Sequence, residues 1–192
     1  MEVKGKKIGF VITGSFSMFN KVIKQMKKLK KLGADIIPIM SENSYILDTK
    51  YGKAKNYIEE IEKICKKKII HTIQDAEYIG PKYLTDILII APASGNTMSK
   101  LACDIIDTSA TMAVKSHLRN DLPVVIAPST NNGLGANLIS IAQLINRRNY
   151  YFVPFRQDNP ITKPRSIVFD PEYIVKTIER ALDDEQISPI IL

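Results

Sequence analysis

The sequence predicts an α/β fold: a single-domain, doubly wound parallel sheet with flanking helices, of the Rossmann-like and flavodoxin-like class. The first observation is a set of β-branched and aliphatic runs, clearest at Ile87–Ala91, which are typical of strands buried on both faces of a parallel sheet. The second is that segments with helical spacing of apolar residues alternate with these runs. The third is the length of 192 residues, which suits one domain over residues 1–192.

The first half of the chain begins with a strand, a Gly-Ser turn and a long amphipathic helix. The turn is Gly14-Ser15, and Gly33 is suited to end the helix because glycine tolerates the left-handed conformation of a C-cap. The predicted elements are strands at 7–13 and 34–40, helices at about 16–32 and 52–67, and a short strand followed by irregular chain at 69–81.

The second half continues the alternation to residue 155. Asp170 is expected to cap the last helix, with Pro171 at its first position. The tail at 187–192 is apolar enough to dock on a neighbouring molecule. The predicted elements are a strand beginning at 87, a helix after the turn that follows it, a helix at about 109–119, a strand at 122–127, a helix at about 138–147, a strand at 150–155 and a helix at about 171–184.

Segment 155–166 departs from this alternation. The nearby prolines Pro154, Pro160 and Pro164 exclude a helix and favour an ordered loop or flap. The segment carries Arg156 and Arg165, whose guanidinium groups can engage carboxylates in a bidentate manner. We predict that Arg156 or Arg165 binds a small dicarboxylate substrate; an oligomer contact is the alternative.

The chain has a formal net charge of +7 and a pI near 9.3. Many lysines surround apolar helical stripes, as on solvated helix faces, and no aromatic platform or recognition helix accompanies them, so nucleic acid is not an expected partner. No leader or membrane-length apolar stretch is seen, and Cys65 and Cys103 are expected to be core thiols in a reducing cytosol. These features predict a cytoplasmic protein without a membrane or metal site.

Small and polar residues follow the strand at Ile87. They form a turn just outside the carboxyl end of a strand, which is where open α/β sheets bind ligands. Ser94 or Asn96 alternatively only caps the helix that follows. The residues expected to contact a flat ligand are Pro92, Ala93, Ser94, Gly95, Asn96 and Thr97.

A second candidate site lies at Gly14 and Ser15, where a strand leads into a helix N-terminus. Backbone N–H groups at such a terminus favour an anion. Ser41, at the end of the neighbouring strand, offers another hydroxyl. The chain lacks the GxGxxG and Walker patterns, which favours a lone phosphate over a dinucleotide or a nucleoside triphosphate. A plain turn with Ser15 as the N-cap is the alternative.

The sequence contains two histidines. His71 lies in an irregular connection and is a candidate general acid or base, because histidine titrates near neutral pH; a structural role is the alternative. His117 falls on a helix among apolar residues and is predicted to be structural.

Residues Pro92–Thr97, Pro-Ala-Ser-Gly-Asn-Thr, resemble the Pro-Ala-Ser-Ala-Asn-Thr turn of the flavoprotein family, which includes the homo-oligomeric flavin-containing cysteine decarboxylases. With Gly14-Ser15 and Asn131, the resemblance covers nearly the whole chain. Within this family, segments 76–82, 129–137 and 152–160 are similar to those of the B subunits of dipicolinate synthases.

The resemblance implies flavin mononucleotide (FMN) as the cofactor, with its phosphate at Gly14, Ser15 and Ser41 and its isoalloxazine ring against Pro92–Thr97. It also implies a homo-oligomer.

The resemblance further implies two catalytic candidates. Asn131 takes the position of an active-site asparagine, and His71 is the nearest counterpart of a catalytic histidine. The decarboxylases have Pro-Ala-Met-Asn and a methionine three residues later, where this chain has Pro-Ser-Thr-Asn and Leu134. These departures argue against decarboxylation of a cysteine-derived substrate.

The implied function is one component of an oxidoreductase that converts a dihydrodipicolinate-type intermediate of the lysine pathway to dipicolinate during sporulation. The implied partner is the A subunit of dipicolinate synthase, which carries NAD(P). The alternatives are a self-sufficient FMN-dependent decarboxylase of the phosphopantothenoylcysteine type and a non-catalytic, phosphate-ligand-binding scaffold for the A subunit.

Overall fold

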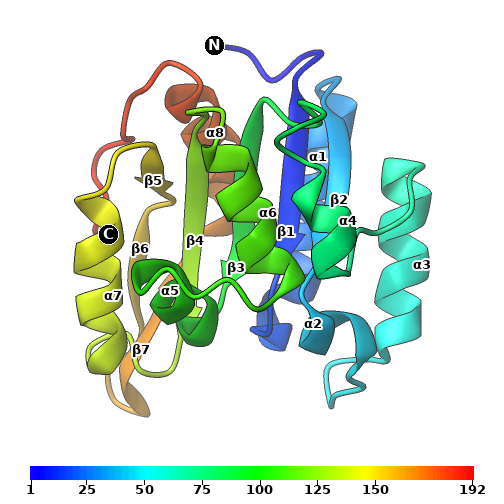
Figure 1. Cartoon of the computed structure of the whole chain (residues 1–192). Helices are drawn as coiled ribbons and strands as arrows, with labels where there is room; N and C mark the ends of the chain where they lie inside the picture. The colour runs from blue at the N-terminus through cyan, green and yellow to red at the C-terminus, as the bar shows by residue number, and fades with distance from the viewer.

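Five parallel strands run in the spatial order β2–β1–β3–β4–β5, which is the flavodoxin-type order (Figure 1). The computed structural model describes residues 1–192. All seven residues of β3 are buried, as the apolar run predicts. The predicted fold class is therefore confirmed. The strands are β1 (Lys7–Ile12), β2 (Asp35–Met40), β3 (Ile87–Ala93), β4 (Val124–Thr130) and β5 (Tyr150–Phe152).

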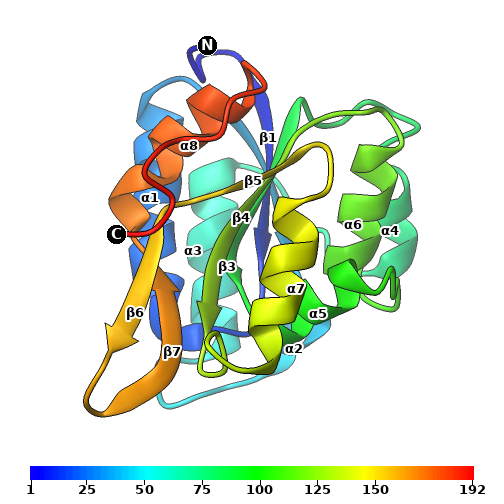
Figure 2. The same ribbon diagram turned by 90° about the vertical axis from the view of Figure 1, so that its left-hand side faces the viewer.

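Helices cover both faces of the sheet (Figure 2). One layer contains α1 (Phe19–Lys31), α3 (Ala54–Cys65) and α8 (Ile174–Ala181), with α1 in contact with the other two. The other contains α4 (Ile73–Glu77), α5 (Gly95–Ala102), α6 (Ser109–Leu118) and α7 (Ala136–Ile145). Three short helices complete the chain, namely η1 (Phe16–Met18), α2 (Glu42–Ile46) and η2 (Pro171–Tyr173).

The amphipathic pattern of α1 explains its orientation. Val22, Ile23, Met26 and Leu29 are buried in the core, whereas most of its lysines are exposed. The segment at 69–81 contributes only one bridge to the edge of β2, between Ile70 and Ile39, and otherwise forms α4. Neither α4 nor α2 is predicted from the sequence, because helices of five residues are too short to show periodicity.

The segment predicted as a flap is a β-hairpin. It consists of β6 (Phe155–Asn159) and β7 (Lys163–Phe169), and β7 pairs antiparallel with the end of β4. The prolines are compatible with this hairpin because Pro160 lies in its turn and Pro164 belongs to none of the registered strand pairs. The expectation of a loop is therefore wrong.

Pairing with β7 also extends β4 beyond its predicted end at Ala127. Ser129 and Thr130 are the residues of β4 that pair with β7. The polar turn after β4 consequently begins near Asn131.

The C-terminal tail docks on its own chain rather than on a neighbour. The Phe155 amide donates to the Ile190 carbonyl (3.0 Å), and the Leu192 amide donates to the Phe155 carbonyl (3.0 Å). Ile187 is buried. This pairing fixes the base of the hairpin, because the tail lies along the start of β6.

Three smaller predictions have clear outcomes. Asp170 caps the C-terminal helical segment by accepting the Glu172 amide, as expected. Cys65 is buried, and this burial raises its pKa to about 12, so it is a core thiol. Cys103 is exposed, which corrects the expectation of two core thiols. The helices all fall short of the length and apolar character needed to cross a bilayer.

Candidate functional site

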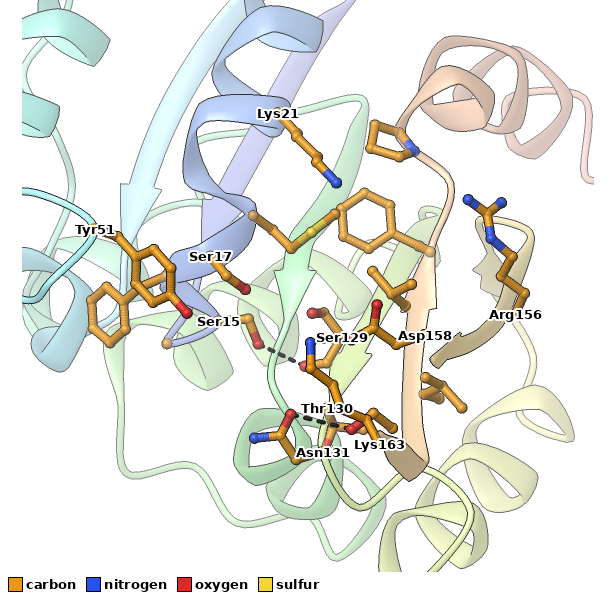
Figure 3. A pocket seen from close by; sticks show the side chains of 18 residues that line it. Ser15, Ser17, Lys21, Tyr51, Ser129, Thr130, Asn131, Arg156, Asp158 and Lys163 are labelled. Atoms are coloured by element: carbon orange, nitrogen blue, oxygen red, sulfur yellow. Dashed lines mark hydrogen bonds and ion pairs between the residues drawn. The ribbon is translucent and has the colours of Figure 1, made fainter. Parts of the chain in front are cut away.

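Two adjoining pockets lie beyond the carboxyl ends of the strands, and both are lined by Gly14 and Phe16. The first lies beyond the ends of β1, β2 and β3, where the strand order reverses, and has a volume of about 430 Å³; we name it the switch-point pocket. The second lies between the β1 and β4 ends and the hairpin, and has a volume of about 540 Å³; we name it the hairpin pocket (Figure 3).

The switch-point pocket collects residues predicted to bind the cofactor from three strand ends. These are Gly14 after β1, Ser41 after β2, and Ser94, Asn96 and Thr97 after β3. The other lining residues are Phe16, Glu42, Asn43, Leu47, Lys100, Asp107 and Thr108.

Ser94 has both of the roles considered for it. It is the N-cap of α5, where its Oγ accepts the Thr97 amide (3.3 Å), and it also lines the pocket. The first N–H groups of a helix have no intrahelical acceptors, so the amide of Asn96, which lines the pocket, remains at the helix terminus as a donor for a ligand. The α5 terminus therefore favours an anionic or strongly polar group.

The remaining residues of the turn do not line either pocket. Pro92 and Ala93 are the end of β3, and Gly95 packs against α7. A Cβ added at Gly95 would lie 2.2 Å from Asn137 Oδ1 and 2.5 Å from Thr130 Oγ1. The glycine is thus required by packing within the chain.

Several polar and charged side chains of the switch-point pocket already have partners within the chain. Ser41 Oγ lies 2.9 Å from Ser44 Oγ, and Glu42 Oε1 accepts the Ser109 amide (2.7 Å). Lys100, the only cation lining this pocket, forms an ion pair with Asp107 (2.7 Å). An anion bound here would therefore depend on backbone amides and hydroxyls more than on a free cation.

Ser15 faces the hairpin pocket rather than the switch-point pocket. It stands at the N-cap position of η1, but its side chain makes no capping bond. Its Oγ donates to the Ser129 carbonyl (2.6 Å), which ties the loop after β1 to the end of β4. The structure thus separates Ser15 from Ser41, although the sequence places both at one phosphate.

The hairpin pocket is lined by three cations and one carboxylate. Arg156 pairs with Asp170 (3.1 Å), and Lys163 pairs with Asp158 (2.7 Å), whose hydrogen bond raises the pKa of Lys163. Lys21 lines the pocket from α1 and forms no ion pair. Figure 3 shows Lys21 extending from α1 above Ser15 and Ser129, with Arg156 on the side of the hairpin. The pocket is suited to an anionic ligand.

Asn131 lies in the hairpin pocket, and its Oδ1 accepts a long hydrogen bond from Ser166 Oγ (3.4 Å). Arg165 does not line this pocket. It borders a separate surface hollow, together with Asn131 and Lys163. The two arginines predicted to bind substrate therefore do not converge.

Neither histidine lines the switch-point pocket or the hairpin pocket. His71 stacks on Tyr45, with ring centroids 3.8 Å apart, and lines neither cavity. His117 is buried between Thr85 Oγ1 (2.8 Å) and the Pro123 carbonyl (3.0 Å), and burial lowers its pKa to about 4. The structural role predicted for His117 is confirmed.

Three residues at the site escape the sequence analysis. Lys21 is one of several lysines on an amphipathic helix, and nothing in that pattern separates it from the lysines that line no pocket. Tyr51 reaches the hairpin pocket from the loop before α3. Thr13 lines neither pocket, but its hydroxyl donates to the Pro92 carbonyl (2.8 Å) and accepts the Ser94 amide (2.9 Å).

Comparisons with known proteins agree with this architecture. The family model described as Flavoprotein matches residues 1–180. The dipicolinate synthase B subunit of Bacillus subtilis (strain 168) is 38% identical over 190 residues, which cover 99% of this chain and 95% of that protein. The crystal structure of the dipicolinate synthase B subunit from Bacillus halodurans has a TM-score of 0.91 and 40% identity, and the match covers 100% of this chain and 98% of that one.

A more distant structure shares the fold alone. The FMN binding protein AtHal3 has a TM-score of 0.66 and 16% identity, covering 96% of this chain and 100% of that one. The much higher identity to the two Bacillus proteins extends over the whole domain. From the family match and this identity, we conclude that the chain belongs to the flavoprotein family and is a homologue of the dipicolinate synthase B subunit.

Proposed function

We propose that the chain is the FMN-binding B subunit of a dipicolinate synthase and acts in the cytoplasm during sporulation. The observation that carries the proposal is the convergence of five predicted cofactor residues, from three strand ends, on the switch-point pocket. With an A subunit that carries NAD(P), it would convert a dihydrodipicolinate-type intermediate of the lysine pathway to dipicolinate.

The residues of the switch-point pocket fit FMN. A Cβ added at Gly14 would meet no atom within 4 Å, so the wall shared by both pockets is open to a ligand. We assign the phosphate to Gly14 and Ser41, and the ring to the Ser94–Thr97 turn at the start of α5. When bound, FMN can accept a hydride, whereas the protein binds and orients the reacting groups.

The hairpin pocket is the proposed substrate site. It meets the switch-point pocket at Gly14 and Phe16, so a substrate in one would lie beside a cofactor in the other. Lys21 forms no ion pair, and Arg156 carries N–H groups beyond the Nη1 that pairs with Asp170, so both can engage the carboxylates of a dicarboxylate. The Asn131 amide can bind another polar group. Arg165 is left out of this assignment because it borders a different hollow.

The structure favours this function over a self-sufficient decarboxylase. The decarboxylase hypothesis needs a histidine at the site, and both histidines lie outside the pockets. The scaffold hypothesis predicts that synthase activity survives damage to the flavin site.

A pair of variants at Gly14 tests the cofactor assignment. Gly14→Asp and Gly14→Asn place side chains of nearly equal size in open space and differ in one negative charge. If the phosphate lies there, FMN binds Gly14→Asp about tenfold or more weakly than Gly14→Asn, because like charges in close contact repel. Riboflavin, which lacks the phosphate, should show no such difference. Visible-absorbance titration measures both, and equal FMN affinities for the two variants would contradict the assignment.

Reconstitution tests the partner. Synthase activity is expected only when this chain and an A subunit with NAD(P) are combined, and activity of the chain alone would contradict the two-subunit proposal.

Helix α7 has no charged residue and exposes Leu138, Ile139 and Ile145, a composition that supports assembly with further proteins, including copies of this chain. The masses of the separate components and of their mixture distinguish a homo-oligomer from a complex that forms only with the A subunit.

A further inference from the structure

Thr13 lies between the end of β1 and Gly14, and its side chain is completely buried. The regular pairing of β1 with β3 extends only to the Val11–Ile90 pair. On the other side of β3, the register with β4 shifts between Ile90 and Ala93. Ala91 and Pro92 therefore have no registered partner on either side, and Ala93 pairs again only with Pro128 of β4 before the turn at Ser94 begins.

The Thr13 hydroxyl takes the place of the missing ladder bonds to β1. Its Oγ1 donates to the Pro92 carbonyl at 2.8 Å and accepts the Ser94 amide at 2.9 Å. A strand residue in this position would use its own carbonyl and amide for these two contacts. One side chain thus joins the end of β1 to both sides of Ala93.

We propose that Thr13 is the positioning residue of the cofactor turn, setting the distance between the two walls of the switch-point pocket. One wall contains Gly14, which follows Thr13 directly, and the other contains Ser94, whose amide the hydroxyl holds. Thr13 lines neither pocket, so it acts through these neighbours and does not touch the ligand. That the ligand is FMN rests on the proposed function; the geometric role does not.

Thr13→Val tests this role because it removes the hydroxyl and keeps the branched shape. Thr13→Ser keeps the hydroxyl and should rescue the defect. Thr177→Val is the matched control, since Thr177 on α8 is equally buried, donates its hydroxyl to the Tyr173 carbonyl (2.8 Å), and lines neither pocket. Thermal melts establish the temperature at which all three variants and the native protein are folded.

In FMN titrations at that temperature, we expect Thr13→Val to bind about tenfold or more weakly than the native protein and to shift the absorbance of the bound flavin. Thr13→Ser and Thr177→Val should bind FMN within about twofold of the native protein. Both variants keep a hydroxyl at position 13 and therefore keep the hydrogen bonds that hold the turn. Equal FMN affinities of Thr13→Val and Thr177→Val would overturn the proposal.

Hydrogen exchange in the ligand-free protein gives a readout that does not depend on the cofactor. In Thr13→Val the amides of residues 94–98 should exchange faster relative to the rest of the chain, and in Thr177→Val they should not. Unchanged protection of the turn in Thr13→Val overturns the positioning role. If the native protein binds no FMN, the proposed function fails, and the exchange comparison still decides whether Thr13 positions the turn.

Discussion

Asn137 on α7 uses its side-chain amide to join the walls of the two pockets. Its Oδ1 accepts the Thr130 hydroxyl (2.7 Å), and its Nδ2 donates to the Gly95 carbonyl (3.2 Å) and to Ser99 Oγ (3.0 Å). Thr130 lines the hairpin pocket, and Gly95 begins α5 at the switch-point pocket. Individual half-buried polar side chains therefore connect segments that the sheet ladder leaves apart, since a polar group removed from water is costly unless it finds such partners.

Lys21 is expected to bind a substrate carboxylate. We predict that Lys21→Met raises the KM for the dicarboxylate about tenfold or more, with little change in kcat, because a charge-assisted hydrogen bond present in both ground and transition states is lost. Lys24→Met is the matched control on the same helix, since Lys24 is exposed and lines neither pocket. Steady-state kinetics of the reconstituted synthase measures both, and equal KM values for these variants would remove Lys21 from the substrate site.

His117 should make stability depend on pH. Its pKa falls from 6.5 to about 4 on folding because the buried site disfavours the imidazolium. The unfolded chain therefore binds more protons between these values, so this stabilising contribution is complete above pH 6.5 and is lost as the pH falls towards 4. We predict a decrease of about 2 kcal/mol in the free energy of unfolding between about pH 7.5 and about pH 5 from this group.

Urea unfolding across this pH range measures the effect. His117→Gln, which cannot titrate, should show a pH dependence that is flatter by about the same amount. If the native protein and this variant have the same pH dependence, His117 is not the group responsible.

The strand–turn–helix unit of β3 and α5 forms the central part of the site. Its strand half is buried by the sheet, whereas its helix half is held by Asn137 from α7 and by Thr13 from the end of β1. The hairpin adds the second pocket by pairing β7 with the end of β4. Each pocket is thus assembled from the ends of regular elements, where residues are free to point away from the sheet.

Alanine substitutions at Gly95 and Gly14 compare the stability cost of a Cβ at a confined position with that at an open position. Gly95→Ala should lower the free energy of unfolding by about 1–3 kcal/mol, because its Cβ would overlap the Asn137 amide and the Thr130 hydroxyl. Gly14→Ala should change it by no more than about 0.5 kcal/mol, since no atom lies within 4 Å of the new Cβ. Chemical denaturation compares the two, and equal losses would show that Gly95 is not confined as the structure indicates.

The C-terminal tail packs against the hairpin and the edge of the sheet. The C-terminal tail lies against β6 and buries Ile187, while Ile191 remains 60% exposed. Gln186 also bonds both the amide (2.7 Å) and the carbonyl (2.8 Å) of Phe152 in β5. The end of the chain therefore braces the sheet edge and the base of the hairpin together.

Truncation of two tail side chains tests this bracing. Ile187→Ala should cost about 2–5 kcal/mol of stability because it leaves a cavity in a buried site. Ile191→Ala should cost less than about 0.5 kcal/mol, because its side chain is mostly in solvent. Thermal or urea unfolding of the full chain provides the values. A small effect of Ile187→Ala would mean that the tail does not dock on its own chain in solution.

Local patterns in the sequence were sufficient for the alternation of strands and helices, the strand–turn–helix transition near Ser94 and the cap at Asp170. Each depends on residues that are close in the chain, whose periodicity and turn chemistry are set by backbone geometry. The hairpin was missed because prolines indicate where regular pairing is interrupted, and do not indicate whether a partner strand is present nearby.

Tertiary structure alone decided which of the candidate residues share a pocket. Thr13 meets Ser94 across 81 residues, and Ser15 meets Ser129 across 114 residues. Lys21 joins Arg156 at the hairpin pocket, whereas Arg165 and His71, equally plausible by residue type, lie outside it. The physical reason is that side-chain direction depends on sheet register and crossover packing, and these are set by burial of the whole core rather than by neighbours in the sequence.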